Sequence, residues 1–349
     1  MGLAEIIFPL WSVYARPSTE ADYPLKEVFV HQAKGSAEAV VKLLSDGKGK
    51  PVLYTAHLMT AVCSDGVCKP IDIHLYWDLL GRFYRYSTGK EPLTKFDHDP
   101  FTEEDHKKLN EILADKNSIL RDYEVEDMID GTVEVSSAQV DGVTGATGKA
   151  FKDASVEGAM YTVYMLWHFV NGDIRTKIYR HTQSMLSEPM IASMLGAGRE
   201  DYLNFVFDNL TEPQREKFAP QIIALLSSKD IYTPHFALQQ LTDELLMDPA
   251  HQEAVLCYFG SVSAFVQNSL LTRLETLPIH RAGVKLLLES APGLTTDQLD
   301  RVFLLIEKNK GSIDADSLTE LKAMRVHGNN PLSRYAECLL AQIPEGESF

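Results

Sequence analysis

The sequence predicts an α+β protein, in which a small antiparallel-sheet domain is followed by an all-α region. Three observations carry this prediction. Apolar and polar residues alternate strictly over 71–79, a favoured two-residue turn stands at Asp65-Gly66, and helical patterns with repeated start signals fill the chain after residue 175. A chain of 349 residues exceeds one compact core, and the expected domains cover 20–172 and 173–349.

Composition and charge exclude several classes of protein. The chain has 33 Lys and Arg against 49 Asp and Glu, a net charge of −16, and 45% of its residues are apolar. That apolar fraction excludes intrinsic disorder, and an acidic chain without clustered Lys and Arg is not expected to bind nucleic acid. No apolar run is long enough for a transmembrane segment. The four cysteines and 11 histidines are scattered, so no metal site is expected.

Two elements are expected before residue 80. Apolar residues spaced by three and four predict a helix over 24–48. A β-hairpin follows, and a type I′ turn at Asp65-Gly66 sets its register, with Tyr54 opposite Trp77. The same register pairs Thr60 with Ile71, Leu58 with Ile73, and Ala56 with Leu75. These residues then share one face of the hairpin, so turn chemistry and hydrophobic pattern agree.

The register also places two cysteines opposite each other. Cys63 and Cys68 form a non-hydrogen-bonded pair, in which Cα atoms lie about 4.5 Å apart. A disulfide bond is permitted at this separation and would favour an exported protein, whereas two reduced thiols are the alternative in the cytosol. Cys257 and Cys338 lie on apolar helix faces, and we expect them in the helical core.

A further helix is predicted to begin after Thr102. This residue is a favourable N-cap, three acidic residues follow it, and Leu109, Ile112 and Leu113 form the expected buried stripe. The segment 121–140 that follows is typical of short strands.

The glycine-rich segment Asp141–Lys149 lies between a predicted strand and a predicted helix over 152–172. Three interpretations compete for it. A Walker-type phosphate loop requires a glycine where Val143 stands and a hydroxyl where Ala150 stands, so two of its groups are absent. A structural turn would use the glycines for positive φ and a threonine as helix cap.

The third interpretation is a resemblance. Residues 141–147 resemble the Asp-x-x-Ser/Thr-Gly-Ala-Thr motif of the FMN-binding domain family, which includes the flavin-carrying C and G subunits of the sodium-pumping NADH:quinone reductase and their Rnf relatives. In that family a flavin transferase esterifies the last threonine with FMN outside the cytoplasm, which implies Thr147 as the acceptor here. The other motif residues are Asp141, Thr144, Gly145 and Ala146. Family members usually carry Ser or Thr after the acceptor, whereas Gly148 stands here.

The resemblance implies covalent FMN as cofactor. A tethered flavin stays bound at any concentration of free FMN, and an adjacent helix N-terminus near Phe151 would offer free amides to its phosphate. The isoalloxazine ring also needs aromatic or apolar cover. Trp77 on the hairpin and Tyr161 on the following helix are the candidates for this cover.

The chain after residue 175 is expected to be helical throughout. Proline in a first helical turn is a start signal, and it recurs at Glu188-Pro189, Glu212-Pro213, Thr233-Pro234, Asp248-Pro249 and Asn330-Pro331. Thr211 with Gln214 and Thr295 with Gln298 fit the capping box. Helices of about 10–15 residues whose pairs recur every ~40 residues predict a HEAT-like solenoid, with an irregular bundle as the alternative.

These inferences predict an exported, periplasmic or otherwise extracytoplasmic flavoprotein. It would carry FMN on Thr147 and transfer electrons between protein partners, with a flavin transferase as a further partner. Residues 1–15 lack the basic start of a signal peptide and are interpreted as a first structural element, with a trimmed signal as the alternative. A non-enzymatic interaction scaffold with a structural turn at 141–148 is the alternative function, and a P-loop-like nucleotide binder is the third.

Overall fold

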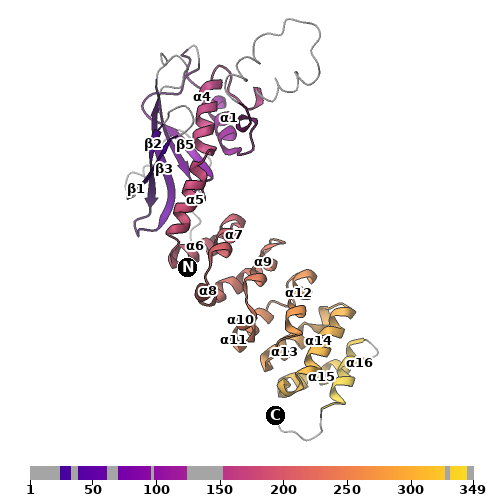
Figure 1. Ribbon diagram of the computed structural model, residues 1–349. Helices are drawn as coiled ribbons and strands as arrows, with labels where there is room; N and C mark the ends of the chain where they lie inside the picture. The colour runs from indigo at the N-terminus through magenta and orange to yellow at the C-terminus, as the bar shows by residue number, and fades with distance from the viewer. Residues whose placement is uncertain are drawn as a thin grey trace, which may run out of the picture. The chain divides into compact units, whose positions relative to one another are not determined.

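The protein divides into two compact units, Met1–Met190 and Ile191–Phe349. The structure, a computed structural model, describes residues 24–32, 38–60, 70–95, 98–123, 152–326 and 331–343. The first unit combines a five-stranded sheet with helices, and the described part of the second unit is helical (Figure 1). The predicted α+β fold class is therefore confirmed.

The sheet is an antiparallel meander whose strands follow sequence order. They are β1 (Leu25–Gln32), β2 (Glu38–Ser45), β3 (Pro51–Thr60), β4 (Ile71–Trp77) and β5 (Phe83–Thr88). The predicted helix over 24–48 is wrong, because β1 and β2 occupy this segment. In β2 the buried Ala39, Val41 and Leu43 alternate with more exposed residues. This period of two is typical of a strand, and the same residues also fit the spacing of a helix.

The predicted register of β3 and β4 is confirmed at every pair. Tyr54 lies opposite Trp77 and Thr60 opposite Ile71, with the intermediate pairs as expected. The apolar residues of these strands line one buried face of the sheet. The connecting turn, with Cys63 and Cys68, lies outside the described residues, so the disulfide stays a prediction.

Helices cover that buried face of the sheet. They are α1 (Glu103–Ala114), α4 (Met160–Asn171) and α5 (Ile174–Ser184) (Figure 1), and the 3₁₀ turn η2 (Ile119–Arg121) packs against α4. The Trp77 indole donates a 3.1 Å hydrogen bond to the Val170 carbonyl oxygen on α4. The Tyr54 hydroxyl lies 2.8 Å from the Thr182 hydroxyl on α5. Because α5 is tied to the sheet in this way, the first unit extends beyond the predicted boundary at residue 172.

The start of α1 is as predicted, whereas that of α4 is not. Thr102 and Asp105 form a reciprocal capping box at the start of α1, and the predicted stripe of this helix is buried. The helix predicted over 152–172 begins only at Met160. Gly158 has a φ of 71°, a left-handed conformation in which an α-helix cannot continue, so the preceding residues form a separate turn.

Helices continue through the described part of the second unit, and the division between units falls within α6. They are α6 (Glu188–Ala197), α7 (Glu200–Asn209), α8 (Glu212–Ala224), η3 (Leu225–Ser227), α9 (Thr233–Gln240), α10 (Asp243–Met247), α11 (Pro249–Leu256), α12 (Ala264–Leu274), α13 (Arg281–Ser290), η4 (Ala291–Gly293), α14 (Thr296–Lys308), η5 (Lys310–Ser312), α15 (Ala315–Val326) and α16 (Pro331–Leu340). Every X-Pro start named above falls at the beginning of a helix.

The later helices of the second unit stack in two layers. In one layer α8 contacts α11, α11 contacts α13, and α13 contacts α15; in the other, α9, α12, α14 and α16 contact one another in the same stepwise order. Such nearest-neighbour packing of alternate helices is the arrangement of an α-solenoid. The predicted capping boxes at Thr211 and Thr295 are both formed.

Cys257 and Cys338 contradict the prediction that they lie in the helical core, because both are exposed. Each adjoins a buried leucine, Leu256 and Leu339, and neighbours in a helix point about 100° apart. In the ranges that the structure describes, no helix has both the length and the apolar character that a membrane crossing requires.

Candidate functional site

The motif that resembles the FMN-binding family lies in the segment between Tyr123 and Lys152, outside the described residues. The site residues concerned are Asp141, Thr144, Gly145, Ala146 and Thr147. Their assignment to a flavin therefore stays a prediction. The described residues on both sides of this segment nevertheless lie together.

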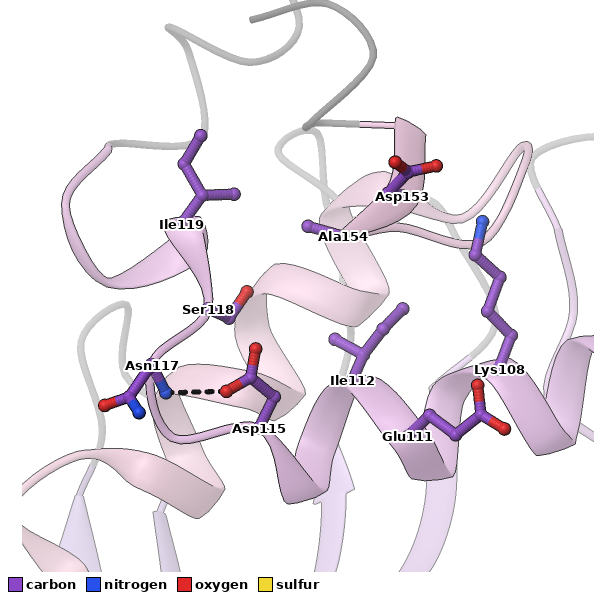
Figure 2. A pocket seen from close by; sticks show the side chains of 9 residues that line it. All are labelled: Lys108, Glu111, Ile112, Asp115, Asn117, Ser118, Ile119, Asp153 and Ala154. Carbon is purple, nitrogen blue, oxygen red and sulfur yellow. Dashed lines mark hydrogen bonds between the residues drawn. The ribbon is translucent and has the colours of Figure 1, made fainter.

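An open hollow of about 460 Å³ lies where the described chain stops and resumes (Figure 2). Its walls come from α1, from the turn that follows α1, and from the residues just after the undescribed segment. The lining residues are Lys108, Glu111, Ile112, Asp115, Asn117, Ser118, Ile119, Asp153 and Ala154. A volume of this size is within the roughly 300–1,000 Å³ that small-molecule sites occupy.

The charges of the hollow are mostly negative. Glu111, Asp115 and Asp153 supply three carboxylates, and Lys108 supplies one ammonium group. The Lys108 ammonium donates a 2.8 Å hydrogen bond to the Lys152 carbonyl oxygen, which ties it to the wall. Since like charges repel, the hollow suits an uncharged ring better than a phosphate group.

Apolar surface is also present in the hollow. The side chains of Ile112, Ile119 and Ala154 face it between the charged groups (Figure 2). A planar ring with an apolar face and polar edges would match this mixture of surfaces. The hollow is therefore a candidate surface for such a ring, and the sequence alone did not indicate it.

The two aromatic residues predicted to cover a flavin differ in exposure. Trp77 has no exposed surface and its indole is bonded to α4, so its ring offers no face to a flavin in this structure. Tyr161, in the first turn of α4, is half-buried and keeps part of its surface accessible. Of the two, Tyr161 alone remains a candidate for flavin contact.

The opposite face of the sheet carries a cluster of three side chains of metal-ligating types. His57 on β3 and Asp72 and His74 on β4 bring their side-chain nitrogen and oxygen atoms within 4.8 Å of one another. The His57 Nε2 lies 2.7 Å from the Asp72 Oδ1. The rings of His57 and His74, which are paired across the two strands, stack with centroids 4.3 Å apart and planes 11° apart.

The backbone holds the Asp72 carboxylate in place. The Lys90 N–H donates a 3.2 Å hydrogen bond to Asp72 Oδ2, and the hydrogen bond with His57 lowers the pKa of Asp72 below its usual value. At Gly89 an added Cβ would lie 1.9 Å from Oδ2, so a larger residue there would displace the carboxylate from this position. Asp72 is therefore a charged carboxylate held in a fixed orientation.

The sequence contained the signal for this cluster. The confirmed register that pairs Leu58 with Ile73 also pairs His57 with His74, and Asp72 shares the face of His74 because alternate strand residues do. The number and spacing of the histidines in the sequence did not indicate this arrangement. His57 lies close to Asp72 and His74 only because β3 pairs with β4.

Comparisons with known proteins add no assignment to these sites. No protein-family model matches the chain, no curated protein matches it, and no solved structure matches its fold.

Proposed function

We propose that this protein is an exported flavoprotein that carries FMN phosphoester-linked to Thr147 and passes electrons between protein partners. The observation that carries the proposal is the match of Asp141–Thr147 to all specified positions of the FMN-binding family motif. The motif supplies a threonine hydroxyl flanked by small residues, which a bulky phosphodiester requires.

The position of the hollow supports this proposal. Thr147 is five residues from Lys152, and five residues of extended chain span at most about 18 Å. This chain length allows the acceptor hydroxyl to reach the rim formed by Asp153 and Ala154. The ribityl chain of FMN would add to this reach and allow the ring to enter the hollow.

The proposed attachment transfers the phosphate end of FMN from a phosphoanhydride to the Thr147 oxygen. The Thr147 Oγ would attack the phosphorus of an FMN phosphoanhydride bound by the flavin transferase, and an Oγ–P bond would form as the anhydride P–O bond breaks. The hydroxyl proton passes to a base of the transferase, and the second phosphate group of the donor leaves. When bound, the flavin supplies the capacity to accept and release electrons.

In this proposal the residues that line the hollow orient the flavin ring and determine the polarity and charge around it. Ile112, Ile119 and Ala154 can contact the ring faces, while Asn117 and Ser118 offer polar groups to its edges. Three carboxylates in the wall disfavour an added negative charge on the ring. The hollow would therefore favour electron transfer at a low potential.

The test is expression of the full chain in the periplasm together with a flavin transferase. We expect intact-mass measurement after denaturation to show one covalent FMN, which Thr147→Ala removes. Thr132→Ala, in the same undescribed segment but outside the motif, is the matched control and should retain the flavin.

Two outcomes would contradict the proposal. An unmodified mass in the presence of an active transferase, with no binding of free FMN, would favour the interaction scaffold. ATP or GTP binding that is lost in Lys149→Ala would favour the nucleotide-binding alternative.

A further inference from the structure

The sheet face opposite α1 and α4 presents three metal-ligand side chains on two adjacent inner strands. His57 contributes from β3, and Asp72 and His74 contribute from β4. These strands are held by the central ladder of the sheet, so the backbone positions of the three residues are fixed. Side chains on paired strands are better fixed than side chains on loops.

We propose that His57, Asp72 and His74 bind a divalent late first-row transition ion, Zn²⁺ or Cu²⁺. Two imidazoles and one carboxylate are a donor set that favours these ions over Mg²⁺ and Ca²⁺, which prefer oxygen ligands. The proposal does not depend on the flavin, because it concerns the opposite face of the sheet.

The distances fit a site that closes around an ion. The three donor atoms lie within 4.8 Å of one another, whereas donors around a tetrahedral zinc ion are separated by roughly 3.3 Å, given bonds of about 2.0–2.1 Å. Binding one ion would require His57 and His74 to rotate out of their parallel stack, so that both ring nitrogens turn toward it. The His57 side chain is 46% exposed, so an ion can enter from solvent.

The Asp72 carboxylate is already oriented for this role. The backbone N–H of Lys90 holds Oδ2, which leaves Oδ1 directed toward the histidines. Gly89 makes this position possible, because any Cβ there would overlap the carboxylate. Such outer contacts typically change metal affinity about 10–100-fold when they are removed.

Two neighbours on the same face extend the site. Met59 lies opposite Asp72 in the ladder and is 62% exposed, so its thioether is accessible as a soft donor that copper favours. Ser87 pairs with His74 across β4 and β5, and it is buried with no hydrogen-bond partner for its hydroxyl among the described residues. A water bound to the ion would satisfy this hydroxyl.

The experiment uses the full, untagged chain with its thiols alkylated, so that Cys257 and Cys338 do not compete for metal. Zn²⁺, Cu²⁺, Mg²⁺ and Ca²⁺ are titrated separately by calorimetry. We expect one equivalent of Zn²⁺ or Cu²⁺ to bind and Mg²⁺ and Ca²⁺ not to bind. Nitrogen couplings in the Cu²⁺ electron paramagnetic resonance spectrum should report two imidazoles.

Variants locate the ion. His57→Ala, His74→Ala and Asp72→Asn should each weaken binding by about 100-fold or more, since they remove a direct ligand. Gly89→Ala removes no ligand but displaces the carboxylate, and it should weaken binding about 10–100-fold. Circular dichroism checks that each variant is folded.

The matched control is His251→Ala. His251 also lies beside a carboxylate, with its Nδ1 3.4 Å from Asp248 Oδ1, but it belongs to no such cluster in the described part of the chain. Its replacement should leave binding unchanged. Absence of Zn²⁺ and Cu²⁺ binding to the folded protein, or equal binding by the His57, His74 and His251 variants, would overturn the proposal and leave His57 and Asp72 as a surface ion pair.

Discussion

The Tyr54 hydroxyl in the middle of the sheet lies 2.8 Å from the Thr182 hydroxyl on α5. Thr182 also donates a 2.6 Å hydrogen bond to the Leu79 carbonyl oxygen, and His181 Nδ1 lies 2.7 Å from the same phenol. Tyr54 is fully buried, and burial raises its pKa to about 12, so the phenol stays protonated at physiological pH. This network connects the sheet to α5.

Tyr54→Phe is expected to reduce the free energy of unfolding by about 1–3 kcal/mol, because it leaves buried polar groups without a partner. Urea unfolding followed by tryptophan fluorescence measures this, since Trp77 and Trp167 lie in the first unit. Tyr84→Phe, at a residue that is 46% exposed, is the control and should change little. Equal stabilities of the two variants would show that the network does not stabilise the fold.

Asp105→Asn is expected to weaken the start of α1 in a pH-dependent way. Desolvation opposes the charge of Asp105, but hydrogen bonds from Lys95 and Thr102 outweigh it and lower its pKa to about 2. A lowered carboxyl pKa contributes stability above the unfolded value near 3.8, and this contribution is lost as pH falls toward 2.

The loss at pH 7 should be about 1 kcal/mol, typical for a helix cap, and the two proteins should converge only as the pH approaches 2. Thermal unfolding across this pH range measures the difference. Glu104→Gln, an exposed acid in the same turn, is the control and should show a smaller effect. A constant difference at all pH values would assign the effect to packing instead.

Local chemistry predicted the parts of this fold in which neighbours in sequence decide the structure. The turn predicted at Asp65-Gly66, together with the alternating pattern of β4, correctly predicted the register of β3 and β4. The capping residues Thr102, Thr211 and Thr295 marked helix starts because their partners lie three residues away.

Non-local contacts decided the features that could not be predicted. In β1 and β2 the apolar residues fit both a helix and a strand pattern, and pairing with β3 selects the strand. The start of the helix expected from residue 152 is shifted to Met160 by one backbone angle at Gly158. The His57 cluster arises from strand pairing, and the hollow beside α1 joins residues more than 30 positions apart.

Acidification below pH 6.5 is expected to destabilise the first unit through His31. This ring is fully buried against Phe169, and desolvation lowers its pKa despite the opposing field of Asp173. The unfolded chain therefore binds a proton near pH 6.5 that the folded chain does not bind, so stability falls as pH decreases.

In this window, one histidine should lower the free energy of unfolding by at most about 1.4 kcal/mol for each unit by which the pH falls. Urea unfolding of the wild type and of His31→Leu between pH 7.5 and 5 compares the two slopes. The pKa values of His106 and His181 are also lowered by burial, so the variant should retain part of the dependence. Identical slopes in both proteins would exclude His31 as a contributor.

Ala154→Phe is expected to fill part of the hollow without touching the attachment point. If FMN is linked to Thr147 and its ring lies against Ala154, the variant should keep the covalent flavin and expose the ring. Flavin fluorescence and its quenching by iodide measure this exposure. Lys116→Phe, at an exposed position that does not line the hollow, is the control. Unchanged quenching in Ala154→Phe would place the ring elsewhere.

Gln252→Leu is expected to weaken the interface between α11 and α13 of the solenoid. Gln252, 1% exposed on α11, donates hydrogen bonds of 3.0 Å to the Leu246 carbonyl oxygen and 2.8 Å to that of Pro278, and it accepts one of 2.9 Å from the His280 N–H. His280 is the N-cap of α13, so this side chain joins one helix pair to the next. Leucine leaves all three backbone groups unpaired.

The free energy of unfolding of the helical unit should fall by about 2–4 kcal/mol, since each buried unpaired group costs about 1–3 kcal/mol and water reaches some of them. Far-UV circular dichroism follows this unit, whose helices dominate the signal, during urea unfolding. Gln239→Leu, at an exposed glutamine of α9, is the control and should change stability by less than about 0.5 kcal/mol. The stability of a solenoid is approximately a sum over the interfaces between neighbouring repeats. A loss of stability in Gln252→Leu but not in Gln239→Leu would therefore show that the interface between α11 and α13 contributes strongly.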